Sequence, residues 1–455
     1  MNKQIRNIKN RAKKTAALIM ALMLALLALA PACTPKKIEQ QDKPNTDAPV
    51  TTAPKNESEK GVVNLSAGVK ANSVAGKAAD DAFITAQTDF AVRLFQNALK
   101  KGENSLVSPL SVMLALAMTA NGAGGETLSG MEKALGGLKI DELNEYLGAY
   151  MKRLNSSDWA KLLAANSIWT NNDSSVAVRE SFLQKNADYY RADIFRADFD
   201  NSTLDAINAW VKEGTDGMIE RILDEMSPNA VMYLVNTLLF EAEWSRKYFD
   251  VDVTEGEFTT NGGEKRNAEF MYSTEHTYLE DELASGFIKP YLGTYAFAAL
   301  LPNEGVDIFD YIASLNGEKL ANTLKNAGDG YIVNAALPKF NFDFSAGLND
   351  ALSAMGMELA FDPNSAEFGG MFDFSQMIAA EPIAYIDRVI HKTHIEVGEQ
   401  GTKAGAATLV EMNAGSAFPG EDMIKTVTLD RPFVFMIIDT ETNIPLFIGA
   451  LTDVD

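Results

Sequence analysis

The sequence is nearly without cysteine. Cys33 is the only one in 455 residues, so no disulfide can form within the chain and the fold must be stable without one. Histidine is almost as scarce, since only His276, His391 and His394 are present. His391 and His394 are three residues apart on an expected strand and therefore face opposite sides, which makes them a poor pair of metal ligands.

Sequence motifs of enzymes are missing as well. The chain has no G-x-S-x-G elbow and no Walker sequence. The glycines between Asn121 and Thr127 follow no expected strand, so they indicate a helix end and a turn rather than a dinucleotide site. We therefore expect that the protein is not an enzyme and that it has no catalytic residue, metal or cofactor.

Positive charge is also limited. The chain has 40 Lys and Arg against 62 Asp and Glu, and its net charge is −22. Binding to nucleic acid needs clustered Lys and Arg, and no such cluster occurs beyond the N-terminus, so nucleic acid is excluded as a partner. The hydrophobic share of 46% is ordinary for a globular protein with a large core.

The first 33 residues have the pattern of a targeting signal. Basic residues from Lys3 to Lys14 precede an apolar run from Ala16 to Ala30, which is short for a membrane span. The run ends at Cys33 and resembles a bacterial lipoprotein signal, in which the cysteine is lipidated and becomes the new N-terminus. Pro31 is not the usual residue at its position, so a plain secretory signal with a coincidental Cys33 remains the alternative.

These features divide the chain into three parts. We expect a signal peptide over 1–32, a flexible tether over 33–77, which is rich in Pro, Thr, Lys, Asn and Ser, and one folded domain over 78–455. The mature protein should lie outside the cytoplasm, either lipid-anchored at the cell surface or secreted. Its contact with a membrane should be through the lipid only, and we expect it to be a monomer.

Helical patterns dominate the first half of the domain and strand patterns the second. Asp80–Lys100 has helical spacing of its apolar residues, and Ser108 with Pro109 forms a good start for an apolar helix. Val231–Phe240 is apolar enough for a strand buried on both faces. Further expected elements are listed here: strands at Ala164–Thr170, Tyr295–Leu301, Gly330–Phe342, Phe433–Asp439 and Leu446–Leu451, and a helix at Ala346–Met355.

The segment Val397–Pro432 is too long for an ordinary connection between two apolar runs. Every second residue from Thr402 to Ala414 is small or apolar, whereas the residues between them include Lys403 and Glu411. A period of two is typical of a strand with one face to bury and one wet face. We interpret this segment as an exposed loop in one state and a sheet strand in another.

Nine stretches in order resemble the serpin family, and the resemblance runs from about residue 80 to the C-terminus. Each stretch alone is weak evidence, but their order and spacing together are specific. They are Asn104–Val112, Asn121–Thr127, Val235–Trp244, Leu337–Phe340, Met355–Phe361, Ile390–Val397, Glu399–Thr408, Arg431–Phe435 and Pro445–Gly449.

The resemblance implies an α+β fold with a large central mixed β-sheet, about eight or nine helices, smaller sheets and an exposed reactive-centre loop. It implies a protease inhibitor that acts as a suicide substrate. The exposed loop spans about 399–430, and a serine protease, or a cysteine protease, would cleave a bond within it. The loop would then insert into the main sheet from a metastable native state and trap the acyl-enzyme.

The family's hinge maps onto Glu399, Gly401, Thr402, Ala404, Gly405, Ala406, Ala407 and Thr408. We call the alternating set from Thr402 to Ala414 the inward parity, because these residues would face the core after insertion. A charged residue in this set would raise the free-energy barrier to insertion, and the set contains none. Gln400 and Lys403 stand where the family usually has acidic residues, but Lys403 falls on the outward parity.

The spacing of the family places the cleaved bond at Gly415–Ser416, within the wider range Met412–Phe418 because the segment after it is longer than usual. Small residues there suit a protease with a shallow pocket, such as an elastase- or subtilisin-like enzyme. A trypsin-like target is disfavoured because no Lys or Arg lies between Lys403 and Lys425. Met412 leaves a chymotrypsin- or cathepsin-like target open.

Five further positions carry over from the family. Ser108, Ser111, Asn236 and His391 resemble the polar cluster that gates insertion, and Trp244 resembles the tryptophan at the sheet top. Each also has an ordinary reading as a capping serine or a satisfied core residue. The alternative is a serpin-fold protein that binds partners at the cell surface without inhibiting proteases. Bulky or charged residues on the inward parity would favour this alternative.

Overall fold

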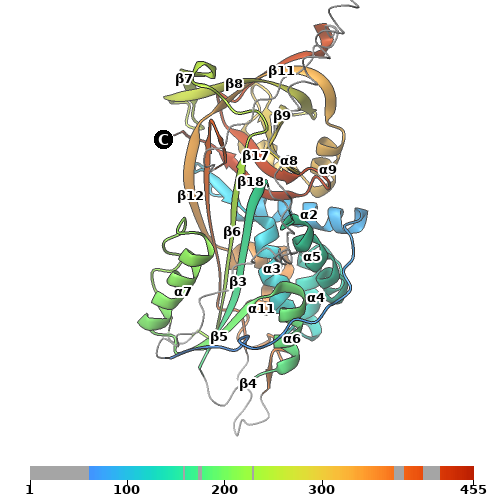
Figure 1. Cartoon of the computed structure of the whole chain (residues 1–455), viewed down its shortest axis with the longest axis vertical. Coiled ribbons are helices and arrows are strands. Elements are labelled where there is room, and N and C mark those ends of the chain that lie inside the picture. The colour runs from blue at the N-terminus through green and yellow to red at the C-terminus, as the bar shows by residue number, and fades with distance from the viewer. Residues whose placement is uncertain are drawn as a thin grey trace, which may run out of the picture. The chain divides into compact units, whose positions relative to one another are not determined.

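The computed structural model describes residues 61–454, apart from 157–158, 173–176, 228–229, 374–383 and 403–420. A mixed sheet of seven strands forms its centre (Figure 1). The β3–β5 and β6–β14 pairs are parallel and the others antiparallel. In spatial order the strands are β1 (Val62–Asn64), β5 (Asp193–Ala197), β3 (Ala160–Asn171), β6 (Met232–Glu243), β15 (Gly401–Thr402), β14 (Arg388–Gly398) and β12 (Phe340–Gly347).

A second sheet of nine strands lies beside it, and β12 continues directly from its strand β11 across Lys339. In order the strands are β16 (Ile424–Thr428), β11 (Gly328–Pro338), β8 (Lys265–Glu280), β9 (Ala284–Pro290), β10 (Tyr295–Pro302), β17 (Phe433–Asp439), β18 (Pro445–Leu451) and β2 (Ser105–Val107), with β7 (Val253–Thr259) paired to β8. A two-stranded pair is formed by β4 (Ala177–Val178) and β13 (Phe372–Asp373).

Helices cover both faces of the seven-stranded sheet. The helix α7 (Asn201–Gly214) packs on β3 and β6 from one side, and α3 (Pro109–Ala120) packs on them from the other (Figure 1). The remaining helices are α2 (Asp81–Ala98), α4 (Gly125–Ala134), α5 (Ile140–Leu154), α6 (Glu180–Tyr190), α8 (Ile308–Ser314), α9 (Gly317–Lys325), and α10 (Asn349–Leu352), which a π turn at Ser353–Met357 joins to α11 (Glu358–Phe361). Short 3₁₀ turns occur at Asp250–Asp252 and Glu421–Met423.

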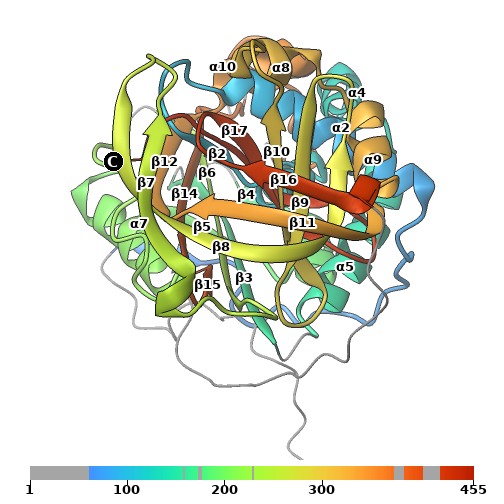
Figure 2. The same cartoon turned by 90° about the horizontal axis from the view of Figure 1, so that it is seen from above.

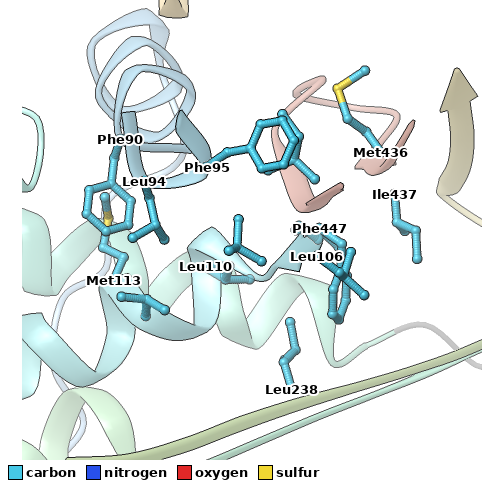
Figure 3. Packing of buried hydrophobic residues seen from close by; sticks show 14 of the residues in the cluster. Phe90, Leu94, Phe95, Leu106, Leu110, Met113, Leu238, Met436, Ile437 and Phe447 are labelled. Carbon is cyan, nitrogen blue, oxygen red and sulfur yellow. The ribbon is translucent and has the colours of Figure 1, made fainter. Parts of the chain in front are cut away.

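The main core lies where α2, α3 and the two sheets meet. Figure 3 shows Phe90 and Leu94 of α2 near Met113 of α3, and Leu238 of β6 below Phe447 of β18. All twelve residues of α3 are buried, as its uniformly apolar sequence predicts. A second cluster, which includes Trp169, Phe199, Trp210 and Tyr233, lies beneath α7.

The expected fold class is confirmed. The described residues hold nine helices when α10 and α11 are taken as one interrupted helix, together with a large mixed central sheet. Strand Val231–Phe240 is β6 and is buried along nearly all its length, and Phe433–Asp439 is β17. The expected strand Gly330–Phe342 is in fact two strands, because the chain turns at Lys339 from one sheet into the other.

Two expected boundaries were wrong. Ala346 and Gly347 still belong to β12, so the helix expected from Ala346 begins only at Asn349. The expected tether 33–77 also extends too far, because residues 61–77 lie against the domain. Val62–Asn64 adds an edge strand to β5, and the Lys77 amide donates to the Glu145 carbonyl at 3.1 Å. Its polar composition hid these backbone contacts, which need no apolar side chains.

Candidate functional site

The two central strands β6 and β14 pair directly at one end and are held apart at the other. At the closed end, which we call the lower end, Arg388–His391 pairs in parallel with Tyr233–Asn236. We call the opposite end the top. Continuing this register by six residues would place Val397 beside Ala242. Instead, both Val397 and Ala242 pair with Thr402 of β15, so one strand already separates β6 from β14 at this level. The two strands therefore diverge from a closed pair to an opening one strand wide.

Close backbone approach at Gly401 explains why β15 can enter this opening. A Cβ built on Gly401 would lie 2.0 Å from the Ala242 carbonyl oxygen, and its φ is +152°. Any side chain there would clash with the backbone of β6, so only glycine fits between the two strands. Thr402, the next residue, is 3% exposed.

Aromatic residues form the top of the opening. The Trp244 indole stacks on Tyr291 with ring centroids 4.3 Å apart, and its Nε1 donates to the Gly398 carbonyl at 2.8 Å. The Tyr291 hydroxyl lies 2.5 Å from the Thr402 Oγ1. Trp244 is 1% exposed. It thus ties the end of β14 and the inserted Thr402 to the end of β6.

Ion pairs hold the turn before β15. Lys339 lies between Glu399 and Glu269, with each nitrogen-to-oxygen distance 2.8 Å, and this contact lowers the pKa of Glu399. Deeper in, Lys289 contacts Glu275 at 2.9 Å and is 1% exposed, and burial lowers the pKa of Lys289. A buried pair of this kind costs several kcal/mol if one partner is removed, because the other charge is then left alone.

The lower end of the opening contains buried polar residues. His391 of β14 is the direct neighbour of Asn236 on β6. The backbone amide of Ser108 donates to the His391 Nε2 at 3.0 Å, and the Ser108 hydroxyl donates to the Leu446 carbonyl at 3.0 Å. Ser108 stands at the N-cap position of α3, but its side chain does not cap the helix. Asn236 Nδ2 donates to Asn166 Oδ1.

Four polar atoms near this point have no hydrogen-bond partner among the described residues. They are Ser111 Oγ, Asn236 Oδ1, Thr237 Oγ1 and His391 Nδ1. Since His391 accepts a hydrogen bond at Nε2, its neutral ring carries the proton at Nδ1. Burial lowers the pKa of His391 from 6.5 to about 4. Leaving such groups unpaired costs about 1–3 kcal/mol each, so the site is rich in unmet hydrogen bonds.

The outward face of the opening is only partly wet. Tyr233 and Val235 of β6 are buried in the cluster beneath α7, whereas Glu396 of β14 is exposed and Glu241 of β6 is half-buried. A strand entering from the top would meet solvent and carboxylates on its outward side first, and would reach α7 further down. The simple division into one buried and one wet face therefore holds only at the top.

The predicted site residues fall into two groups. Glu399, Gly401, Thr402 and Trp244 lie together at the top of the opening, and Ser108, Asn236 and His391 lie together at its lower end; Ser111 is buried one turn further along α3. The hinge residues Ala404, Gly405, Ala406, Ala407 and Thr408, the bond Gly415–Ser416 with its range Met412–Phe418, and Cys33 lie outside the described residues.

Sequence reasoning missed Lys339, Tyr291, Lys289 and Glu275 as parts of the sheet top. Lys339 lay within a stretch that was noted for its resemblance, but nothing in its sequence context pairs it with Glu399, sixty residues later. Glu275 belongs to β8, Lys289 belongs to β9 and Tyr291 directly follows β9, and no strand was predicted in this part of the chain. Their partners come from distant parts of the chain, and local patterns do not show such contacts.

The family comparison decides what this arrangement is. The model of the family "Serpin (serine protease inhibitor)" matches residues 85–454. The chain belongs to the serpin family. Serpins are generally protease inhibitors rather than catalytic enzymes.

Individual relatives agree with this assignment. An uncharacterised serpin-like protein of Thermococcus kodakarensis is 30% identical over 377 residues, which are 81% of this chain and 85% of that protein. Leukocyte elastase inhibitor A of Mus musculus is 28% identical over 389 residues, 81% of this chain and 98% of that protein. The thermophilic serpin tengpin in its native state is 46% identical, with a TM-score of 0.80, and the match covers 87% of this chain and all of tengpin.

The conformation is also nearer to the native than to the latent form of that relative. Tengpin in its latent state gives a TM-score of 0.72 over 84% of this chain. Within the described ranges, no group of His, Cys, Asp or Glu is arranged to hold a metal ion. In the same part of the chain, no helix combines the length and apolar character needed to cross a membrane.

Proposed function

We propose that this serpin inhibits proteases as a suicide substrate. A serine protease, or a cysteine protease, attacks the segment after Thr402, and the segment enters the opening between β6 and β14 as a new strand. Insertion carries the acyl-enzyme away before it is hydrolysed. The observation that supports this most strongly is β15, because the hinge residue Gly401 and Thr402, the first residue of the expected strand, already separate β6 from β14.

The register of β15 predicts the partners of every later residue in the inserted state. Counting on from Thr402, which pairs with Ala242 and Val397, the antiparallel register brings Thr408 between Asn236 and His391. The Thr408 hydroxyl would then lie where the Asn236 and His391 side chains each have an unpaired polar atom. Insertion would satisfy groups that cost free energy in the native state, which gives the released energy a specific source.

The composition of the bait segment favours an elastase- or subtilisin-like target. Ala414, Gly415, Ser416 and Ala417 are small, and no Lys or Arg occurs between Lys403 and Lys425. The relative named leukocyte elastase inhibitor A points to the same class of protease. Lipid attachment at Cys33 remains part of the proposal and would place the inhibitor at the cell surface.

The test uses the chain from Thr34 onward, which lacks the expected signal and the lipid-bearing Cys33, mixed with pancreatic elastase, subtilisin or chymotrypsin and separated on a denaturing gel. A band near the summed masses of inhibitor and protease, resistant to denaturant, is the expected result. If only a clipped inhibitor band appears with all three enzymes, the protein is a substrate and the non-inhibitory surface-binding alternative takes its place.

A further inference from the structure

A pocket lies beside the top of the opening, where the chain leaves β6 and approaches the second sheet. Its volume is about 360 Å³, which is within the range of sites for small molecules. One side of the pocket comes from the chain between β6 and β7, namely Arg246, Lys247, Tyr248 and Asp252. The other side comes from β8, β11 and β16, and Figure 2 looks down on these three strands where they lie side by side.

The lining residues from the sheet are small or carry groups that form hydrogen bonds. They include two rows that cross the three strands on one face, Thr274–Asn334–Thr426 and Tyr272–Ala336–Thr428. Ala336 has only a methyl group, so space remains between Tyr272 and Thr428. Hydroxyl and amide groups can donate as well as accept hydrogen bonds, and this side of the pocket therefore suits a ligand with several hydroxyl groups.

The opposite side of the pocket carries one positive charge without a partner. Arg246 is exposed and forms no ion pair with any residue that the structure describes. Lys247, in contrast, is paired with Glu243 at 2.9 Å, and a carboxylate oxygen of Asp252 accepts the Phe249 amide at 2.9 Å. A guanidinium group binds a carboxylate through two parallel hydrogen bonds, so Arg246 suits a ligand with a carboxylate. The nearby Asp252 disfavours a ligand with more than one negative charge.

The segment 244–248 that borders the pocket also holds the turn before β15. The amide of Trp244 donates to the Gln400 carbonyl at 2.9 Å, and the amide of Tyr248 donates to the Glu399 carbonyl at 3.0 Å. These two bonds tie the end of β6 to the end of β14. A ligand that joined Arg246 to the sheet would restrict the movement of this segment, and with it the movement of the turn.

We propose that this pocket binds small carboxylates that carry several hydroxyl groups, the class of the sugar acids, and that the bound ligand slows strand insertion. The carboxylate lies against Arg246, and the hydroxyl groups bond to the threonine and asparagine side chains of the sheet. The site itself goes beyond the proposed function, whereas its effect on insertion rests on that function.

Binding is measured by calorimetric titration of the chain from Thr34 onward, at constant ionic strength, with three six-carbon compounds. Gluconate has both the carboxylate and the hydroxyl groups, sorbitol lacks the carboxylate, and hexanoate lacks the hydroxyl groups. Gluconate should bind about tenfold more tightly than either of the others, because only gluconate can engage both sides of the pocket.

Three variants locate the binding. Arg246→Gln removes the charge from an exposed side chain and should weaken gluconate about tenfold without changing the response to sorbitol. Thr426→Val removes one exposed hydroxyl group at nearly constant shape and should weaken gluconate about threefold. Arg221→Gln is the matched control, because Arg221 is an exposed arginine that does not line the pocket. All three variants should melt at the temperature of the unaltered protein.

Hydrogen exchange reports the effect on the turn without any protease. Gluconate should slow the exchange of the Trp244 and Tyr248 amides severalfold, because their acceptors Gln400 and Glu399 would separate from them less often. With elastase present, gluconate should also raise the number of inhibitor molecules cleaved for each protease trapped. Neither effect should occur with Arg246→Gln.

Failure to bind gluconate, or equal binding by Arg246→Gln and the unaltered protein, would overturn the site. Sorbitol that bound as tightly as gluconate would overturn it as well, since the charge would then play no part. Binding that left both hydrogen exchange and the trapping ratio unchanged would overturn the link to the turn. Binding with slowed exchange in a protein that elastase, subtilisin and chymotrypsin only clip would support the site and reject the proposed inhibition.

Discussion

At the scale of single residues, His391 links the opening to pH. Its ring is 1% exposed, accepts a hydrogen bond from Ser108 at 3.0 Å and has a pKa near 4. Between about pH 4 and 6.5, the His391 imidazole is therefore protonated in the unfolded chain but neutral in the native state. The native state loses stability as the pH falls through this window, and the loss is complete near pH 4.

The predicted loss from His391 is on the order of 3 kcal/mol between pH 7 and pH 4. His391→Gln keeps an acceptor for the Ser108 amide but cannot titrate, so its melting temperature should fall less steeply with acid than that of the unaltered protein. His394→Gln is the control, because His394 lies on the same strand but on its opposite face, where it contacts Asp343 of β12. Parallel curves for the unaltered protein and His391→Gln would show that His391 does not carry this dependence.

Lys403 has a predicted role that its sequence context alone does not reveal. The register of β15 places it, once inserted, between Glu241 of β6 and Glu396 of β14. Both carboxylates lie near the solvent-exposed top of the sheet, where a partly exposed pair contributes about 1 kcal/mol or less. The positive charge at this hinge position would therefore assist insertion, although the family usually has an acidic residue there.

Lys403→Glu should slow insertion, because three carboxylates would then meet at one level of the sheet. We expect roughly a fivefold increase in the number of inhibitor molecules cleaved for each protease trapped, consistent with a loss of about 1 kcal/mol. For Lys403→Gln, the number of inhibitor molecules cleaved for each protease trapped should lie between the values of the unaltered protein and Lys403→Glu. An unchanged ratio for both variants would show that the register does not continue as β15 predicts.

At the scale of elements, much of the sheet could be predicted from the sequence but its connections could not. The apolar run that became β6 and the strand β17 were recognisable because burial on both faces leaves no polar alternation. The division of Gly330–Phe342 at Lys339 was not, since strand propensity continues through the turn between sheets. The contacts of Lys339 with Glu399 and of Tyr291 with Thr402 depend on tertiary packing.

Gly401 provides an element-scale test of β15. Gly401→Ala would place a Cβ against the Ala242 carbonyl oxygen and should expel β15 from between β6 and β14. Trp244 fluorescence should change, because Thr402 would no longer contact Tyr291 beneath the indole, and trapping should give way to cleavage. Gly398→Ala is the matched control, since its Cβ would meet nothing within 4 Å. Identical fluorescence and trapping in both variants would contradict this role of β15.

At the scale of the whole molecule, the proposed function requires a native state that is not the most stable arrangement of its chain. Among the described residues, the opening between β6 and β14 has unpaired polar atoms at its lower end, and Gly401 and Thr402 pair between the two strands at its top. The family and the fold class were predictable from the sequence, whereas the parity of the inserting strand stays a prediction because residues 403–420 lie outside the described residues. The depth to which β15 already enters was not predictable, because the same residues suit both a loop and a strand.

The most direct measurement of this central claim is the melting temperature before and after cleavage of the bait. The chain is nicked between Met412 and Phe418 with an elastase, the enzyme is removed, and both forms are heated under the same conditions. Insertion of Lys403–Met412 would complete the sheet and bury its inward face, so the cleaved form should melt at a much higher temperature. Melting of the cleaved form at the same or a lower temperature would contradict strand insertion.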